Sequence, residues 1–164
     1  MQQKPLPPVP EGISGYFFMR LCTDSFSEDG SEWYNFKSLE NLPPYSCKYE
    51  LDPDNPLSFR RPPGTKDFYV IELPLRAALE TMEEEEQFLL NPARWNNVTR
   101  DLSEGWCYHP WMSALPGGRP TLQNGRHRIV TMMRLLGMTS APFVVEPEHI
   151  AAVKAWPEFK LATA

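Results

Sequence analysis

The sequence predicts an α/β protein of the α+β type, in which a small mixed sheet with flanking helices follows a proline-rich N-terminal extension. Two stretches carry this prediction. Residues 119–145 read as a strand, a turn, a helix and a second strand, and residues 67–75 read as one further strand. The chain of 164 residues also has 18 prolines, which interrupt helices and sheets, so no long regular element is expected before Asp67.

The composition indicates one folded unit with two parts, residues 1–65 as the extension and residues 66–164 as the α/β domain. A chain of this length suits a single hydrophobic core. Cys22, Cys47 and Cys107 are scattered and form no CxxC pair, so the sequence favours neither a disulfide framework nor a structural zinc site. Because we find no apolar leader and no run of membrane length, we expect a cytoplasmic protein.

Within the extension, residues 16–22 and 32–36 are aromatic-rich runs, and the segment between them contains Asp29-Gly30, a good turn signal. We therefore expect a β-hairpin in this part of the chain. The proline-rich arm at 1–11 is expected to be a loose end, with docking to a partner as the alternative.

Residues 67–75 form the clearest strand of the first half, because β-prone side chains precede Pro74, and we expect this strand in the middle of the sheet. Glu72 lies in this apolar run, and Arg76 follows four residues later. Glu72 is either a site carboxylate, which holds a metal or activates a water, or half of an ordinary ion pair with Arg76.

Two helices are expected next. Residues 77–90 are helical by composition, and the acidic run at 83–86 is either a solvated face or a surface for a basic partner. Val98 and Leu102 recur at helical spacing, which predicts a second helix ending near Gly105. The aromatic turn at 106–111 either packs on the core or provides a stacking wall for a base.

The stretch at 119–145 has the clearest local signals. Asn124 is a favourable N-cap, and apolar residues then follow at the spacing of one helix face from Ile129 to Leu136. Gly137 can close that helix in the left-handed conformation, after which an apolar strand is expected. A short closing helix is predicted within residues 147–156.

Positive charge gathers at the start of the central helix. Arg126 and Arg128 lie where the helix macrodipole disfavours cations by roughly 0.3–1 kcal/mol each. Between Gly105 and Val145 there is no acidic residue, and four arginines give this stretch +4, so the rest of the chain carries −9 within a net charge of −5. A positive island on an acidic protein suits a local anionic ligand such as a nucleotide better than a long duplex.

These residues form the candidate binding site. Gly125 would let a phosphate approach the free amides at the helix start. Side chains two positions apart point about 200° away from each other around a helix, so we assign Arg126 to the turn and Arg128 to the first helical turn. His127 is either a proton donor or acceptor in the site or a packed residue. No metal ligand is assigned.

The run LQNGRHRIVTMMRLLGMTSAPFVV resembles the signature of the ParB/sulfiredoxin superfamily, in which an apolar strand leads into D-G-x-H-R, a helix, L-G and a short strand. The upstream run FYVIELPLRAAL resembles the early strand and loop of the same fold. This resemblance implies a ParB/sulfiredoxin-like sheet with a nucleotide-phosphate site at Asn124, Gly125, Arg126, His127 and Arg128. It implies ATP or another nucleoside triphosphate as ligand, with Mg²⁺ as an accompanying ion.

Two departures from the signature narrow the expectation. Asn124 stands where the family usually has Asp, so it keeps an acceptor but loses the charge, and binding is better supported than catalysis. Arg126 occupies the place of the sulfiredoxin cysteine, so sulfinic-acid repair is not expected. Among the remaining branches, the chain is most similar to the small plasmid fertility-inhibition proteins.

Several functional hypotheses follow from these residues. The leading one is an NTPase or DNA nuclease of plasmid or phage biology, as in conjugation inhibition, with Glu72 and His127 as catalytic residues and DNA as a further partner. The second is a noncatalytic inhibitor that keeps the fold to block a protein of a secretion or conjugation machine. A small-molecule kinase of the same superfamily is a further alternative.

Overall fold

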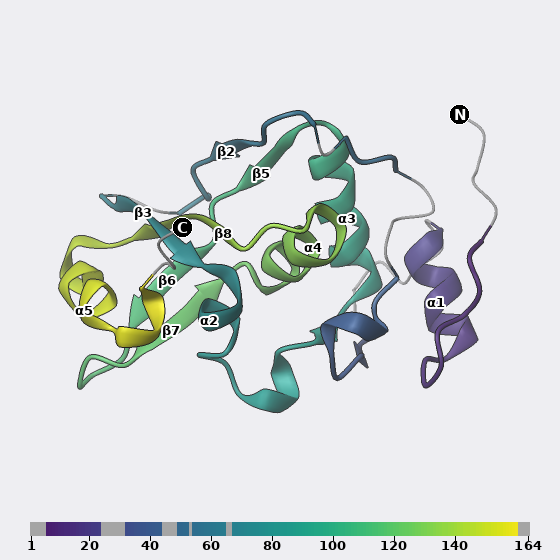
Figure 1. Cartoon of the computed structure of the whole chain (residues 1–164), viewed down its shortest axis with the longest axis horizontal. Coiled ribbons are helices and arrows are strands. Elements are labelled where there is room, and N and C mark those ends of the chain that lie inside the picture. The colour runs from purple at the N-terminus through teal and green to yellow at the C-terminus, as the bar shows by residue number, and fades with distance from the viewer. Residues whose placement is uncertain (1–5, 24–31, 44–48, 53, 65–66, 161–164) are drawn as a thin grey trace.

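Four strands form the central sheet of the computed structural model, which describes residues 6–23, 32–43, 49–52, 54–64 and 67–160. Their order in the sheet is β3-β8-β6-β7, with the bounds β3 Tyr69–Pro74, β8 Ser140–Val145, β6 Trp111–Ala114 and β7 Pro120–Asn124. Strand β8 runs antiparallel to β3 and parallel to β6, whereas β6 and β7 form an antiparallel hairpin. The sheet is mixed, and helices flank it (Figure 1).

Two small sheets connect the N-terminal third of the chain to the rest. Strand β1 (Tyr34–Asn35) pairs antiparallel with β4 (Leu89–Leu90), and β2 (Ser58–Arg60) pairs parallel with β5 (Trp106–Tyr108). The sequence predicted no strand at β2, because the prolines around it hide so short an element. Figure 1 shows α1 and α5 at opposite ends of the molecule, with β2 and β5 between them.

Helices α3 (Pro92–Ser103) and α4 (Arg126–Leu136) pack against each other. Helix α4 is the more deeply buried of the two, because Ile129, Val130 and Met132 are fully enclosed in the main core. The other helices and 3-10 turns are α1 (Gly15–Cys22), η1 (Leu39–Asn41), α2 (Leu75–Leu79), η2 (Glu84–Glu86), η3 (Pro147–His149), α5 (Ile150–Ala155) and η4 (Pro157–Phe159).

The strand–helix–strand unit predicted at 119–145 is confirmed as β7, α4 and β8. Gly137 adopts a φ of 64° and ends α4, and its N–H donates to the carbonyl oxygen of Met132. One detail differs: the N-cap residue is Gly125 rather than Asn124, and no side chain of the described residues caps the helix. Within that part of the chain, the first-turn amides of α4 therefore have no side-chain acceptor.

The predicted hairpin in the extension is wrong, because its first strand is helix α1. The Ser14 hydroxyl accepts the N–H of Phe17 at 3.4 Å, and α1 buries Phe17, Phe18 and Leu21 on one face. The aromatic run fits the periodicity of a strand as well as that of a helix, and the N-cap serine favours the helix. The second predicted strand survives only as β1, which pairs with β4 instead; Asp29-Gly30 lies outside the described residues.

The strand predicted at 67–75 is confirmed as β3, but it lies at the edge of the sheet rather than in its middle. Only β8 pairs with it among the described strands. Its first half faces solvent, since Tyr69 and Val70 are each more than half exposed. High β-propensity therefore reports the strand itself and not its place in the sheet.

The helix predicted at 77–90 is largely wrong. Helix α2 ends at Leu79, and the chain continues through η2 to β4. Thr81 helps to end the helix, because its hydroxyl donates to the Ala78 carbonyl and accepts the N–H of Leu122 on β7. The acidic run at 83–86 is exposed, as its solvated interpretation predicts.

The two predicted parts of the chain share one hydrophobic core. Phe17, Phe36 and Leu42 of the extension belong to the same cluster of buried residues as Ile129 and Phe143. The closing helix predicted within 147–156 is confirmed by η3 and α5. In the part of the chain that the structure describes, no helix has the length and apolar character needed to cross a membrane.

Candidate anion-binding site

A cleft of about 520 Å³ lies where the N-terminal end of α4 meets one face of α3. We call it the arginine cleft. It is lined by Arg94, Asn97, Val98, Arg100 and Asp101 of α3, by Tyr108 of β5 and by the turn residues Asn124, Gly125, Arg126, His127 and Arg128. The five residues that the sequence predicted for phosphate binding are therefore brought together in one concave site.

Arg126 and Arg128 are both in the first turn of α4, so the assignment of Arg126 to the preceding turn is wrong. Their side chains diverge and lie beside different rings. The guanidinium carbon of Arg126 is 5.5 Å from the ring centroid of Trp33, and that of Arg128 is 5.8 Å from the ring centroid of Tyr108. The cleft therefore has two cationic walls, each backed by an aromatic ring.

Several donor atoms of these arginines are buried without a protein acceptor. Within the described residues, Nε of Arg126 and both Nε and Nη2 of Arg128 have no hydrogen-bond partner. Burial lowers the pKa of both guanidinium groups, and the charge of Arg94 lowers the pKa of Arg126 further. Since unpaired buried donors are costly, this arrangement fits an anion that supplies the missing acceptors.

Gly125 is required at this turn for a different reason from the one predicted. Its φ is 113°, which side-chain-bearing residues rarely adopt, and an added Cβ would lie 3.0 Å from Cα of Pro110. The same Cβ would lie 3.3 Å from Nε of Arg128. The absent side chain therefore makes room for the protein's own backbone and for the Arg128 guanidinium.

His127 is held as a hydrogen-bond acceptor. It is 7% exposed, and its Nε2 accepts the N–H of Asn91 at 3.0 Å. Burial, reinforced by the charges of Arg126, Arg94 and Arg128, lowers the pKa of His127 from 6.5 to about 3. The imidazole is therefore neutral near pH 7, with its proton on Nδ1, and only Nδ1 is left for a role in the cleft.

Asn91 connects three segments around the cleft. Its Oδ1 accepts the N–H groups of Ala93 and Arg94 at the start of α3, and its Nδ2 donates to the carbonyl oxygen of Glu32 at 2.8 Å. Its backbone N–H donates a hydrogen bond to Nε2 of His127 on α4. This N-cap residue thus fixes α3, the segment at β1 and the arginine turn relative to one another.

Several residues at the site were not predicted from the sequence, because long-range packing brings them there. Arg94, Asn97, Arg100 and Asp101 of α3 line the cleft. Trp33, in the segment before β1, lies beside Arg94 and Arg126 without lining the cleft itself. Asp101 is the single acidic residue among the described residues that line the cleft. Its side chain is 16% exposed and pairs with Arg100 at 3.2 Å, and burial raises its pKa. The sequence signal that could have identified Asp101 is its position as a carboxylate within the helix predicted from Val98 and Leu102.

Glu72 does not line the arginine cleft. It is exposed on the edge strand β3, where it pairs with Pro142 of β8. No ion pair with Arg76 forms in the described structure, so neither predicted role of Glu72 has support from a contact. In the aromatic turn, Trp106 packs edge-on against Tyr108 at 5.0 Å, and Tyr108 lines the cleft. Its role as a stacking wall for a base stays a prediction.

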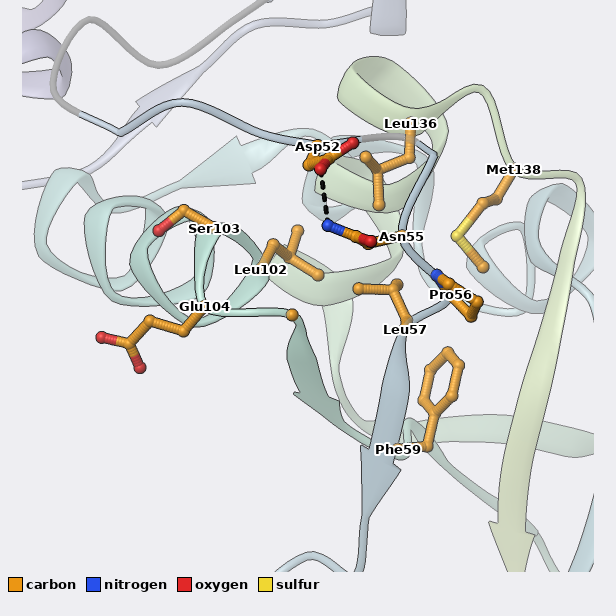
Figure 2. Close-up of a pocket in the computed structure, with 11 residues that line it drawn as sticks. Asp52, Asn55, Pro56, Leu57, Phe59, Leu102, Ser103, Glu104, Leu136 and Met138 are labelled. Atoms are coloured by element: carbon orange, nitrogen blue, oxygen red, sulfur yellow. Dashed lines mark hydrogen bonds between the residues drawn. The ribbon is translucent and has the colours of Figure 1, made fainter.

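Two further hollows lie outside the arginine cleft. One, of about 200 Å³, adjoins the same turn and is lined by Arg94 and Met82 as well as by the turn residues. The other, of about 290 Å³, lies at the C-terminal ends of α3 and α4, and Figure 2 shows Leu57, Leu102 and Met138 facing one another across it. Helix C-termini disfavour anions, and the lining also includes the carboxylates of Asp52 and Glu104, so this pocket is a poor phosphate site.

The described residues contain no group of three or more histidine, cysteine or acidic side chains that could hold a metal ion. Asp101 alone does not make a magnesium site, so the protein residues of the cleft do not fit a dedicated Mg²⁺ site. Cys107 is buried, and burial raises the pKa of its thiol to about 12, which makes it inert as a nucleophile. Cys47 lies outside the described residues.

Comparisons of this chain with protein-family models, with curated proteins and with solved structures found no match.

The depressed pKa of His127 predicts a pH dependence of stability. Below the unfolded-state pKa of 6.5, His127 binds a proton in the unfolded chain but not in the native state. The free energy of unfolding therefore falls as pH drops from 6.5 toward 3, by at most about 1.4 kcal/mol per pH unit from this residue. Urea unfolding of wild type and His127→Gln across this range should give the smaller slope for the variant. An NMR titration in which the His127 ring has its midpoint near 6.5 contradicts the assignment.

Proposed function

We propose that this protein binds a nucleoside triphosphate, with the phosphates held at the N-terminal end of α4 in the arginine cleft. One observation carries the proposal: among the described residues, the buried donor atoms of Arg126 and Arg128 lack a protein acceptor, and no side chain caps the first-turn amides next to them. Charge-assisted hydrogen bonds to phosphate oxygens would satisfy these donors, and the helix dipole favours the same charge.

The distribution of charge supports the same ligand class. Arg94, Arg100, Arg126 and Arg128 line the cleft against one carboxylate, Asp101. This local excess of +3 matches a compact polyanion, whereas the net charge of −5 disfavours a long duplex. The resemblance of the 122–145 run to the ParB/sulfiredoxin signature points to the same turn and the same ligand.

Hydrolysis of the bound nucleotide is the second part of the proposal, and Asp101 is its candidate general base. Water would attack the terminal phosphorus and pass its proton to the Asp101 carboxylate, while the bond from that phosphorus to the bridging oxygen breaks. Burial already raises the pKa of Asp101, as proton acceptance requires. Glu72, predicted for this role, is outside the cleft. No step is assigned to Mg²⁺. Cleavage of DNA and a role in plasmid or phage conjugation rest on the resemblance alone.

A noncatalytic binding module is the competing function, and one observation favours it. His127 uses Nε2 to hold Asn91 and stays neutral, so it cannot serve as a general acid near pH 7. Under this alternative the protein binds nucleotide without turnover, and binding controls a partner such as a component of a secretion or conjugation machine.

Removing either cleft arginine should weaken nucleotide binding. We expect Arg126→Ala and Arg128→Ala each to lower the affinity for ATP roughly 10- to 100-fold, since each change removes charge-assisted bonds of roughly 1.5–3 kcal/mol. Isothermal titration with a panel of nucleotides measures this loss. Arg119→Ala is the matched control, because Arg119 is exposed in the β6–β7 turn and does not line the cleft. Unchanged affinity in both cleft variants rejects the site.

The rate of phosphate release distinguishes the two candidate functions. If Asp101 is the general base, Asp101→Asn should lower phosphate release by roughly 100-fold or more while it leaves ATP affinity within a few-fold of wild type. Glu72→Gln is the control, and its rate should equal that of wild type. Tight binding with no phosphate release by the wild-type protein supports the noncatalytic module, and a rate that depends on an added hydroxyl acceptor supports a kinase.

A further inference from the structure

We propose that Trp33 is the base-binding face of this site, so that a purine ring stacks on its indole while the phosphates occupy the arginine cleft. This inference rests on the proposed nucleotide function and adds to it. It makes the N-terminal extension part of the site and selects a purine nucleotide over a plain polyphosphate.

Trp33 lies next to the phosphate-binding residues although it is distant in sequence. Its ring centroid is 5.5 Å from the guanidinium carbon of Arg126, 5.1 Å from that of Arg94 and 5.9 Å from the ring centroid of His127. Arg126 therefore lies beside this ring and has one buried donor, Nε, without a partner among the described residues. A nucleotide whose phosphate binds Arg126 would place its base near this indole.

The backbone on both sides of Trp33 is anchored, and the residue is open to solvent. The backbone carbonyl of Glu32, the residue before it, accepts a hydrogen bond from Nδ2 of Asn91, and the Glu32 carboxylate pairs with Nε of Arg20 at 2.9 Å. Tyr34, the residue after it, pairs with Leu90 in the β1–β4 sheet. The side chain of Trp33 is nonetheless 38% exposed. An open aromatic ring on an anchored backbone suits base stacking, since less conformational freedom is lost on binding.

Tyr108 is the other ring at the cleft, and its surroundings make it the weaker stacking platform. Arg128 lies over it, and Trp106 packs edge-on against it at 5.0 Å. The guanidinium carbon of Arg60 lies 4.1 Å from the ring centroid of Trp106. Both rings have protein groups beside them, but Tyr108 is only partly exposed, whereas Trp33 is among the exposed large hydrophobic residues.

A purely structural role for Trp33 makes a different prediction. If the indole only positions the guanidinium groups of Arg94 and Arg126, its loss weakens every phosphate ligand equally. If it stacks on the base, its loss weakens ATP and leaves inorganic triphosphate, which has no base, unaffected. Stacking on one aromatic ring is worth roughly a 5- to 150-fold change in affinity.

The test compares ATP with inorganic triphosphate on the full chain by isothermal titration. Trp33→Ala should bind ATP at least fivefold more weakly and triphosphate as wild type does, and Trp33→Phe should recover most of the ATP affinity. Tyr69→Ala is the control for loss of an exposed aromatic ring, since Tyr69 is on the outer strand β3. Equal weakening of both ligands in Trp33→Ala, or unchanged ATP affinity, overturns the proposal.

Fluorescence gives an independent readout that needs no alanine variant. The chain has five tryptophans, and ATP should quench the emission of wild type but not that of Trp33→Phe. Two results together would reject base stacking and keep the phosphate site: triphosphate binds to wild type but not to Arg128→Ala, and ATP leaves the emission of Trp33 unchanged. If wild type binds neither ligand, both proposals fail.

Discussion

The hydrogen bond from the Asn91 N–H to Nε2 of His127 is the interaction on which the candidate site depends. It fixes the first turn of α4 to the start of α3, and the arginine cleft is the space between these two elements. The Asn91 side chain also holds Glu32, so the same residue determines where Trp33 lies. Because the bond requires a neutral imidazole, burial and the surrounding arginine charges maintain the state of His127 that the architecture needs.

The same arginine charges are unfavourable for the protein without a ligand. The positive end of the α4 dipole, the mutual repulsion of Arg94 and Arg126 and the burial of unpaired donors all oppose cations at this place. Residues that conflict with local physical preference in an otherwise consistent fold are typical of functional sites. An anionic ligand would convert each of these costs into an attraction, and ligand binding would then stabilise the folded state.

Local signals explain which parts of the fold and the site could be predicted from the sequence. The unit containing β7, α4 and β8 was predictable because helix periodicity, a closing glycine and an apolar strand agree within one short stretch. Helix α1 was not, since its aromatic run fits a strand as well as a helix until Ser14 is recognised as the cap. The turn residues of the site were predictable for the same reason, whereas only tertiary packing brings Asp101 to the cleft and Trp33 beside Arg126. Glu72 is the opposite case: its place in an apolar run suggested a site residue, but it is exposed on β3 and does not line the cleft.

Backbone amide chemical shifts of the isotope-labelled full chain, followed during addition of inorganic triphosphate, test the central claim most directly. The account predicts that the amides of Arg126, His127 and Arg128 shift together and saturate with a single dissociation constant, because these N–H groups at the start of α4 bind the phosphate oxygens. Shifts confined to exposed basic residues such as Arg119, with the α4 amides unchanged at saturation, would contradict it.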